Sequence, residues 1–220
     1  RSYQRLLQYF HPKILLGLTA TPERMDGADI LKYFGGHIAA EIRLPDAIER
    51  RLLCPFHYFG VEDPISLKDI KWTHGQYDTE ELTRVYTAEG TLAKQRAQAI
   101  GAALERYTAD LRDVKGLGFC VSKKHAHFMA DYFNQMGISS QALDADSPRE
   151  LRRSVRQQLE RGEIHFIFTV DLFNEGVDIP SINTVLFLRP TQSMTVFLQQ
   201  LGRGLRLSEG KDCLTVLDFV

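Results

Sequence analysis

The second half of the chain alternates short apolar segments with segments of helical length, and this alternation constrains the fold more than any other feature. Segments rich in Val, Ile, Leu and Phe predict five strands, at residues 116–122, 139–145, 164–170, 184–189 and 213–220. Helices are expected between most of them, at 123–136, 148–161 and 194–202. Buried strands joined by helices of this length are typical of βαβ units. The sequence therefore predicts an α/β fold with a parallel sheet flanked by helices.

The first half of the chain shows a different organisation. Residues 13–18, "KILLGL", predict one buried strand that ends in "TATP". Residues 54–61, "CPFHYFGV", predict a strand that opens the second unit, and a long helix with an apolar stripe is expected from Glu80 to Leu111. We place the domain boundary between these parts, which gives domains at 1–53 and 54–220.

The helix expected at 148–161 has a marked start and a basic face. Ser147 is the expected N-cap, Pro148 fits the first turn, and Glu150 completes a capping box. One face is apolar and another carries arginines: Leu151, Val155 and Leu159, and Arg149, Arg153 and Arg156. A solvated surface and a phosphate-binding surface both fit this pattern.

Composition excludes several classes of protein. With 44% hydrophobic and 25% charged residues and a net charge of −1, the chain has the composition of a globular protein. Its apolar stretches are too short to span a bilayer, so we expect no membrane partner. The three cysteines form no C-x-x-C pair, which favours reduced thiols in a cytoplasmic protein and predicts no metal site. The chain begins at Arg1 without methionine and is expected to be part of a longer protein.

Four short stretches lie at the ends of predicted strands or on helices that lead from them. They are "LTATPER" (18–24), "FCVSKKHA" (119–126), "TVDLFNEGVDIP" (169–180) and "QQLGRGLR" (199–206). Arginine carries a permanent charge on a fork that matches phosphate oxygens, and a serine or lysine at a helix start can donate to phosphate. A carboxylate beyond a strand end commonly binds a ribose hydroxyl. These residue types therefore favour nucleotide and nucleic-acid chemistry.

The order and spacing of the four stretches resemble motifs III, IV, V and VI of superfamily 2 helicases and translocases. The likeness is strongest to the DEAH-type branch that includes the motor subunits of type I and type III restriction enzymes. The resemblance covers nearly the whole chain and implies RecA-like domains. It also implies ATP and Mg²⁺ as cofactors and nucleic acid as partner, with DNA favoured over RNA.

The resemblance assigns the last stretch to nucleotide hydrolysis. Arg203 corresponds to the first arginine finger and Arg206 to the second. Gln199 occupies the position that couples nucleotide to nucleic acid, and Gly202 lets the backbone approach closely. An arginine that reaches a γ-phosphoryl group from a second domain neutralises charge as that group is transferred.

The other stretches supply further expected contacts. Gly176 allows a tight turn and Asp178 is assigned to a ribose hydroxyl, while Thr19 and Thr21 of "TATP" link nucleotide state to domain closure. The residues expected to bind nucleic acid are Ser122, Lys123, Ser147, Arg149 and Thr169. Many relatives have threonine directly before the first aspartate of motif V. Here Val170 stands in that position and Thr169 is one residue earlier, so its side chain is expected on the other side of the strand.

Two elements of the helicase family are missing from the sequence. It contains neither G-x-x-x-x-G-K-[ST] nor Asp-Glu-x-His, which hold the phosphates and magnesium and precede motif III in the family. Residues 1–53 thus resemble the end of a first RecA-like domain and 54–220 a second one. ATP and Mg²⁺ would be held mainly by the missing part of the first domain, a partner in cis. The chain alone is expected not to turn over ATP.

Two other functions remain open. The chain could be a non-catalytic α/β module that binds nucleic acid or protein and keeps a degenerate motor fold. A nucleotide-sugar or dinucleotide enzyme fits less well, because the glycines of "GLGFCVS" precede the strand instead of following it. A P-loop and Asp-Glu-x-His upstream of Arg1 would favour the motor. The sequence gives no indication of oligomeric state.

Overall fold

The computed structural model describes residues 2–10, 12–19, 30–73, 75–88, 90–170, 179–190 and 193–220. Its internal contacts divide the chain into two compact units, Arg1–Leu44 and Pro45–Val220. The second unit contains all of the strands in the described part of the chain. It also contains most of the candidate functional residues, so its architecture decides where they lie.

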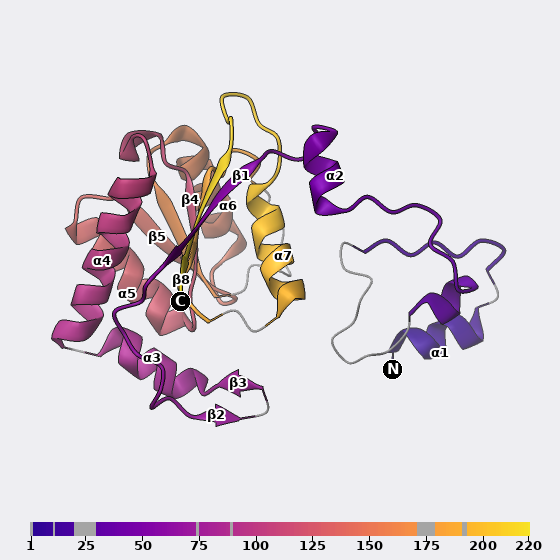
Figure 1. Cartoon of the computed structure of the whole chain (residues 1–220), viewed down its shortest axis with the longest axis horizontal. Helices are drawn as coiled ribbons and strands as arrows, with labels where there is room; N and C mark the ends of the chain where they lie inside the picture. The colour runs from indigo at the N-terminus through magenta and orange to yellow at the C-terminus, as the bar shows by residue number, and fades with distance from the viewer. Residues whose placement is uncertain are drawn as a thin grey trace. The chain divides into compact units, whose positions relative to one another are not determined.

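A six-stranded sheet forms the centre of the second unit (Figure 1). Every neighbouring pair in it is parallel. In spatial order the strands are β1 (Phe56–Val61), β8 (Leu214–Phe219), β7 (Thr184–Phe187), β4 (Gly116–Phe119), β6 (Phe166–Thr169) and β5 (Ser140–Leu143). Each lies within a segment for which the sequence predicted a strand. The predicted α/β fold with a parallel sheet is confirmed.

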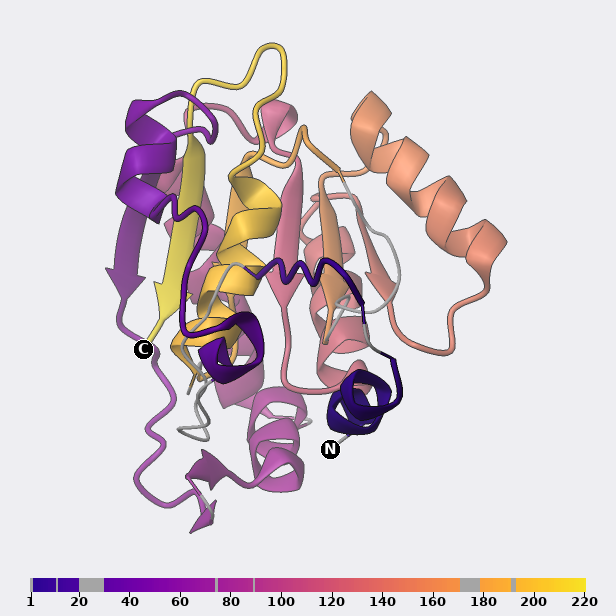
Figure 2. The same cartoon turned by 90° about the vertical axis from the view of Figure 1, so that its right-hand side faces the viewer.

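Helices cover both faces of this sheet. Figure 1 shows α4 (Thr91–Tyr107) and α5 (Lys123–Gln135) on one side and α7 (Met194–Gly204) on the other. Figure 2 shows α7 crossing in front of the strands. Parallel strands are joined by right-handed crossovers, so chain direction decides the face. Along the sheet, the connection from β4 to β5, which contains α5, runs in one direction. The connections from β5 to β6 and from β7 to β8, which contain α6 (Arg149–Arg161) and α7, run in the opposite direction. Helix α6 therefore lies on the same face as α7.

The main core lies where α4 and α5 pack on the sheet. Phe133 of α5 makes edge-to-face contacts with Phe166 and Phe168 of β6, with ring centroids 5.3 and 4.9 Å apart. The two β6 rings lie over the neighbouring strand β4, where glycines stand opposite them in register. A Cβ atom on Gly116 would be 2.0 Å from the Phe166 ring, and one on Gly118 would be 2.4 Å from the Phe168 ring. The glycines of "GLGF" therefore leave room for phenylalanines one strand away.

The prediction of one long helix from Glu80 to Leu111 is wrong, because two helices occupy this region. They are α3 (Thr79–Thr87) and α4, and a 3₁₀ helix follows at Leu111–Asp113. The break lies at Ala88, with ψ of 141°, and at Gly90, which is extended with φ −159° and ψ 172°. Glycine is a poor helix former, so a helix ends before this position and another begins after it. The predicted stripe on α4 is confirmed by its buried residues: Ala93, Ala97, Ile100 and Leu104.

The predicted start of α6 is also wrong. Pro148 occupies the N-cap position and there is no side-chain cap. The Ser147 hydroxyl instead accepts from Asp144 N at 3.0 Å and lies 3.3 Å from Asp144 Oδ1. A serine bound within a turn cannot also cap the helix, so the expected capping box does not form. Of the apolar face, Val155 and Leu159 are buried whereas Leu151 is 44% exposed.

Further short elements complete the second unit. Helix α2 (Leu44–Glu49) precedes β1, and an antiparallel hairpin of β2 (Trp72–Thr73) and β3 (Gln76–Tyr77) precedes α3. Asp78 caps α3 through its side chain, which accepts from Glu80 N and Glu81 N. No helix in the described parts of the chain combines the length and the apolar character that a membrane crossing requires.

The first unit contains α1 (Ser2–Tyr9) and a 3₁₀ helix at Leu31–Phe34. The strand predicted at residues 13–18 does not form, and Ile14, Leu16 and Leu18 are 86, 73 and 88% exposed. A strand requires a neighbour that binds its backbone N–H and C=O groups. The described residues of this unit include no such strand, so the apolar segment remains unpaired there.

Candidate nucleotide and nucleic-acid site

Helix α7 carries Arg203 and is followed closely by Arg206, the two arginines expected to contact nucleotide. Its first turn is capped by Ser193, whose hydroxyl accepts from Val196 N at 3.3 Å. Its last residue, Gly204, packs closely on the first residue of β8, because a Cβ atom there would be 2.6 Å from the Leu214 side chain. The C-terminal end of α7 is therefore held against the start of β8.

One face of α7 presents the residues predicted to act on nucleotide. Gln199, Gly202 and Arg203 are spaced three and four residues apart, which places them together on one side of a helix. Gln199 is exposed, whereas Gly202 and Arg203 are partly buried. Arg206 lies just beyond the helix end and is exposed.

The neighbouring Gln200 differs from Gln199. It is 0% exposed, and its amide nitrogen and oxygen have no hydrogen-bond partner among the described residues. A buried amide without partners is costly, so this residue is a candidate for a role in the site that the sequence did not indicate. Nothing in the pattern "QQLGR" separates the two glutamines by burial before the helix is packed on the sheet.

The two glycines of α7 have opposite surroundings. A Cβ atom on Gly202 would meet no described residue within 4 Å, whereas one on Gly204 would meet Leu214. The face around Gly202 therefore leaves space at the backbone, next to Arg203. Among the described residues, none occupies the space next to the helix backbone at this position.

Alanine substitutions at these glycines are expected to have opposite effects on stability. Gly202→Ala should raise the free energy of unfolding by about 0.5–1 kcal/mol, because alanine is the better helix former and open space is available. Gly204→Ala should lower it by about 1–3 kcal/mol, because the methyl group forces the Leu214 side chain to move. Urea denaturation followed by circular dichroism measures both. A loss of stability in Gly202→Ala would contradict the open space described for this face.

The start of α5 carries the first two residues expected to bind nucleic acid. Ser122 is the N-cap of α5, and its hydroxyl accepts from His125 N at 3.2 Å. That hydroxyl retains a proton that it can donate to a phosphate oxygen. Lys123 forms an ion pair with Asp146 from the loop after β5, and this carboxylate raises the pKa of the lysine. Because the two side chains are 48% and 80% exposed, the pair is weak and a phosphate can compete for the ammonium group.

The other expected nucleic-acid residues follow neighbouring strands. Ser147 is partly buried in its turn with Asp144, and Arg149 is exposed at the first position of α6. Thr169, the last residue of β6, is 0% exposed and its hydroxyl has no partner within the described ranges. Since β4, β6 and β5 are adjacent and parallel, their carboxyl ends bring this group to one edge of the sheet. The structure therefore gathers these residues but buries Thr169.

Four predicted residues remain: Thr19, Thr21, Gly176 and Asp178. Thr21, Gly176 and Asp178 lie outside the described residues. Thr19 belongs to the first unit, where it is exposed and outside regular secondary structure. In the described part of the chain, no three His, Cys, Asp or Glu side chains are grouped in a way that could hold a metal ion.

A buried charged network lies directly behind the start of α5, and the sequence reasoning missed it. Arg96 of α4 is 1% exposed. Its Nε donates to Asp63 Oδ2 at 2.8 Å and its Nη2 donates to Leu188 O at 3.1 Å. The guanidinium lies over the Tyr86 ring, 3.8 Å from the centroid, and burial raises the pKa of this tyrosine to about 12. The only signal in the sequence is one arginine within the apolar stripe of α4.

The network joins the ends of three strands. Asp63 follows β1, Leu188 follows β7, and His125 reaches the segment after β4, where Val121 N donates to its Nδ1 at 3.2 Å. The His125 Nε2 is 3.3 Å from Arg96 Nη1. Burial and the nearby Arg96 charge hold the pKa of His125 well below its usual value, so the ring is neutral. Arg96 and His125 thus fix the carboxyl edge that presents Ser122 and Lys123.

Comparisons with known proteins identify the family of the chain. Residues 99–208, half of the chain, match the family described as helicase conserved C-terminal domain. IRC3 of Saccharomyces cerevisiae, which its name places among the ATP-dependent helicases, is 27% identical over 100% of this chain and 32% of its own length. The type I restriction enzyme EcoAI endonuclease subunit of Escherichia coli is 24% identical over 99% of this chain and 29% of its own length.

A solved structure shares the fold. The ATP-dependent type ISP restriction-modification enzyme LlaBIII, bound to DNA, aligns with 86% of this chain and 13% of its own with a TM-score of 0.57 and 20% identity. The chain spans about a third of the length of the two curated relatives above. The resemblance to superfamily 2 helicases is confirmed by the family match, and the sheet described above is the RecA-like fold of such domains. The chain belongs to the helicase family defined by this C-terminal domain.

Proposed function

We propose that this chain is the C-terminal motor half of an ATP-dependent helicase or translocase. In this proposal Arg203 and Arg206 are the arginine fingers that complete an ATP site held mainly by residues upstream. The observation that carries it is the face of α7 on which Gln199, Gly202 and Arg203 lie together, with open space at Gly202. The family match and the ATP-dependent relatives support it.

The residues present fit part of a nucleotide site. The space at Gly202 admits a phosphate close to the helix backbone, and Arg203 follows it directly. Bound ATP with Mg²⁺ would supply the phosphoanhydride bond that is hydrolysed. The chain's own part is to neutralise charge on the γ-phosphoryl group and to orient it, which guanidinium groups do without a change of protonation. By the resemblance, Gly176 and Asp178 would add a turn and a ribose contact, and Thr19 and Thr21 a link to domain closure.

The nucleic-acid track is proposed along the carboxyl edge of β4, β6 and β5. Ser122 and Lys123 at the start of α5 and Arg149 at the start of α6 supply donors and positive charge there. Phosphate contacts of this kind bind without reading sequence. DNA is favoured as the track because restriction enzymes are among the similar proteins. Thr169 is buried, so it would contact nucleic acid only after the edge opens.

The proposed domains keep the boundary that the sequence predicts between residues 53 and 54. Residues 1–53 would end a first RecA-like domain and 54–220 would form the second. The exposed apolar side chains of residues 14–18 support this, because a strand of this composition is stable only between neighbours. The rest of the first domain, in cis, would supply those neighbours together with the groups that hold ATP and Mg²⁺.

Phosphate release by two forms of the protein tests the proposal. Residues 1–220 alone should release phosphate from ATP at the background rate, because the groups that cradle the phosphates are missing from this sequence. The intact protein, with its upstream sequence, should hydrolyse ATP, and DNA should stimulate it more than RNA. Turnover by residues 1–220 would contradict the proposed division of the site. An intact protein that binds nucleic acid but never hydrolyses ATP would favour the non-catalytic module.

A further inference from the structure

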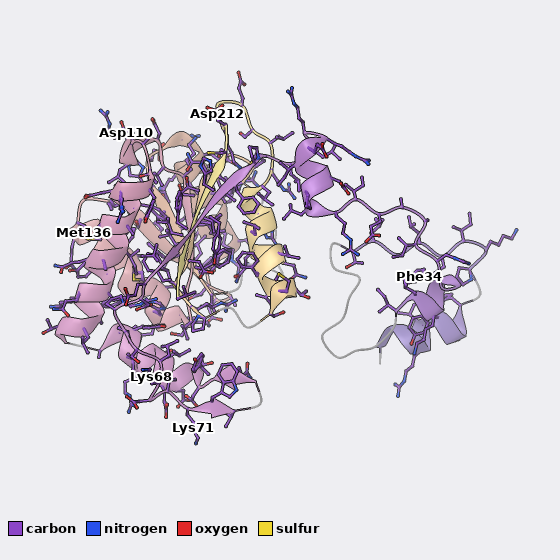
Figure 3. All side chains as sticks on the ribbon, viewed as in Figure 1. Phe34, Lys68, Lys71, Asp110, Met136 and Asp212 are labelled. Carbon is purple, nitrogen blue, oxygen red and sulfur yellow. The ribbon has the colours of Figure 1, made fainter. Side chains whose placement is uncertain are left out.

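Lys211 binds carbonyl groups from two segments that are far apart in the sequence. It lies in the loop between α7 and β8, next to Asp212, which Figure 3 labels. Its Nζ donates to Gly204 O at 2.5 Å and to Arg206 O at 2.8 Å, at the end of α7. It also donates to Pro180 O at 3.2 Å. One ammonium group therefore joins the end of the arginine-bearing helix to the end of the stretch 169–180.

A second contact fixes the same helix end. Cys54 N, just before β1, donates to Leu205 O at 2.8 Å, and Cys54 Sγ is 3.6 Å from Gly204 O. The last carbonyls of a helix have no donor within the helix and are usually bound by water or by capping groups. Here the carbonyls of residues 204, 205 and 206 are all bound by groups from outside the helix. The backbone from Gly204 to Arg206, directly after Arg203, is thereby held in place.

The surroundings of Lys211 make the burial of its positive charge unfavourable. The side chain is partly buried, and burial lowers its pKa. Its acceptors are uncharged carbonyls, and the described residues place no carboxylate within ion-pair distance of it. A cation at a helix C-terminus interacts favourably with the helix dipole, but this only partly offsets the loss of water. Such an arrangement is expected where a defined geometry is needed.

We propose that Lys211 is a positioning residue for ATP hydrolysis, which holds the end of α7 to the backbone at Pro180. Without it, the finger arginines would keep their charge but lose their fixed position. Misplacement by about 1 Å can reduce a catalysed rate about 100-fold, so position matters as much as charge. This inference rests on the proposed function, because it relates the three hydrogen bonds of Lys211 to the reaction of those arginines.

Two measurements on Lys211→Met test the proposal. Methionine keeps an unbranched side chain, one atom shorter than lysine, and removes all three donors. In residues 1–220, hydrogen exchange should become faster in the α7 end, residues 200–206. In the intact protein, kcat of nucleic-acid-stimulated ATP hydrolysis should fall about 10- to 100-fold, with KM for ATP changed less than about twofold. Lys211→Arg, which keeps the charge and donors, should recover part of kcat.

Lys115→Met is the matched control. Lys115 Nζ donates to Glu160 O at 2.7 Å, at the end of α6, so it makes the same kind of contact on a helix without the finger arginines. It should speed exchange at the end of α6 and leave kcat within about twofold of wild type. Equal losses of kcat in both variants would show a general structural effect and overturn the proposal. So would unchanged exchange at residues 200–206 in Lys211→Met. If the wild-type protein hydrolyses no ATP, the proposed function fails. Hydrogen exchange at residues 200–206 still decides whether Lys211 holds the end of α7 in place.

Discussion

Replacing Arg203 with alanine is expected to lower nucleic-acid-stimulated ATP turnover by the intact protein about a thousandfold or more. The residue lies in the last turn of α7, directly after the glycine whose surroundings are open. Loss of the guanidinium removes charge where charge develops during phosphoryl transfer, but removes little of the ground-state contact with ATP. ATP affinity, measured by titration with a fluorescent analogue, should therefore remain nearly unchanged. Steady-state phosphate release measures the turnover.

Arg112→Ala is the control for this substitution. Arg112 is an exposed arginine whose Nη2 is 2.6 Å from Asp110 Oδ2, and Asp110 lies beside α4, on the other side of the sheet from α7 (Figure 3). Its removal should leave turnover within about twofold of wild type. If Arg203→Ala retained wild-type turnover, the assignment of Arg203 as a finger would be wrong. An equal fall in ATP affinity and in turnover would show that Arg203 binds the ground state as tightly as the transition state.

Asp63→Asn is expected to lower the free energy of unfolding by about 3–5 kcal/mol. The Asp63 and Arg96 side chains are only 6% and 2% exposed, and their charged atoms are 2.8 Å apart. The substitution leaves the guanidinium buried without its carboxylate, and His125 cannot replace it because its ring is neutral. Guanidinium chloride denaturation followed by circular dichroism measures the loss. A double substitution, Asp63→Leu with Arg96→Met, should recover much of it, because no charge then remains buried.

The Arg156–Glu160 pair provides the comparison within the same chain. These residues lie one turn apart on α6, with Nε and Oε1 separated by 2.9 Å and side chains 38% and 36% exposed. Its disruption by Glu160→Gln should change stability by only about 0.3–0.5 kcal/mol, because solvent screens an exposed pair. If Asp63→Asn lowered the free energy of unfolding by no more than Glu160→Gln, the buried Arg96 charge would not depend on its carboxylate partner.

The inner strands of the six-stranded sheet could be predicted because they are short apolar runs, and burial on both faces of a parallel sheet requires that pattern. The errors lie where a neighbouring segment decides the local structure. Gly90 ends the continuity of a helix that was expected to run from Glu80 to Leu111, and Ser147 binds Asp144 although its spacing fits a helix cap. Residues 13–18 have the composition of a strand but no neighbour among the described residues of their unit.

The candidate site was predictable in part for a similar reason. Charged or polar residues near glycine, such as Arg203 and Ser122, stand out because their types suit phosphate. The burial of Gln200 and the Arg96 network depend on how helices pack, which spacing along one helix does not reveal. Lys211 lies in "EGKD", a pattern that carries no signal of the carbonyl groups to which it donates. The roles of Gly176, Asp178 and Thr21 stay predictions.

The pairing of glycines in β4 with phenylalanines in β6 also sets the alignment of these two strands by shape. Backbone hydrogen bonds in a parallel ladder repeat every second residue, so they would tolerate a shift by two positions. Such a shift would place Cys120 opposite Phe168, where a β-carbon would collide with the ring as it would at Gly118. It would also move Ser122 along the strand axis by about 6–7 Å relative to Thr169. The two glycines of β4 thus fix the register of β4 with β6, and this register determines the position of Ser122 at the start of α5.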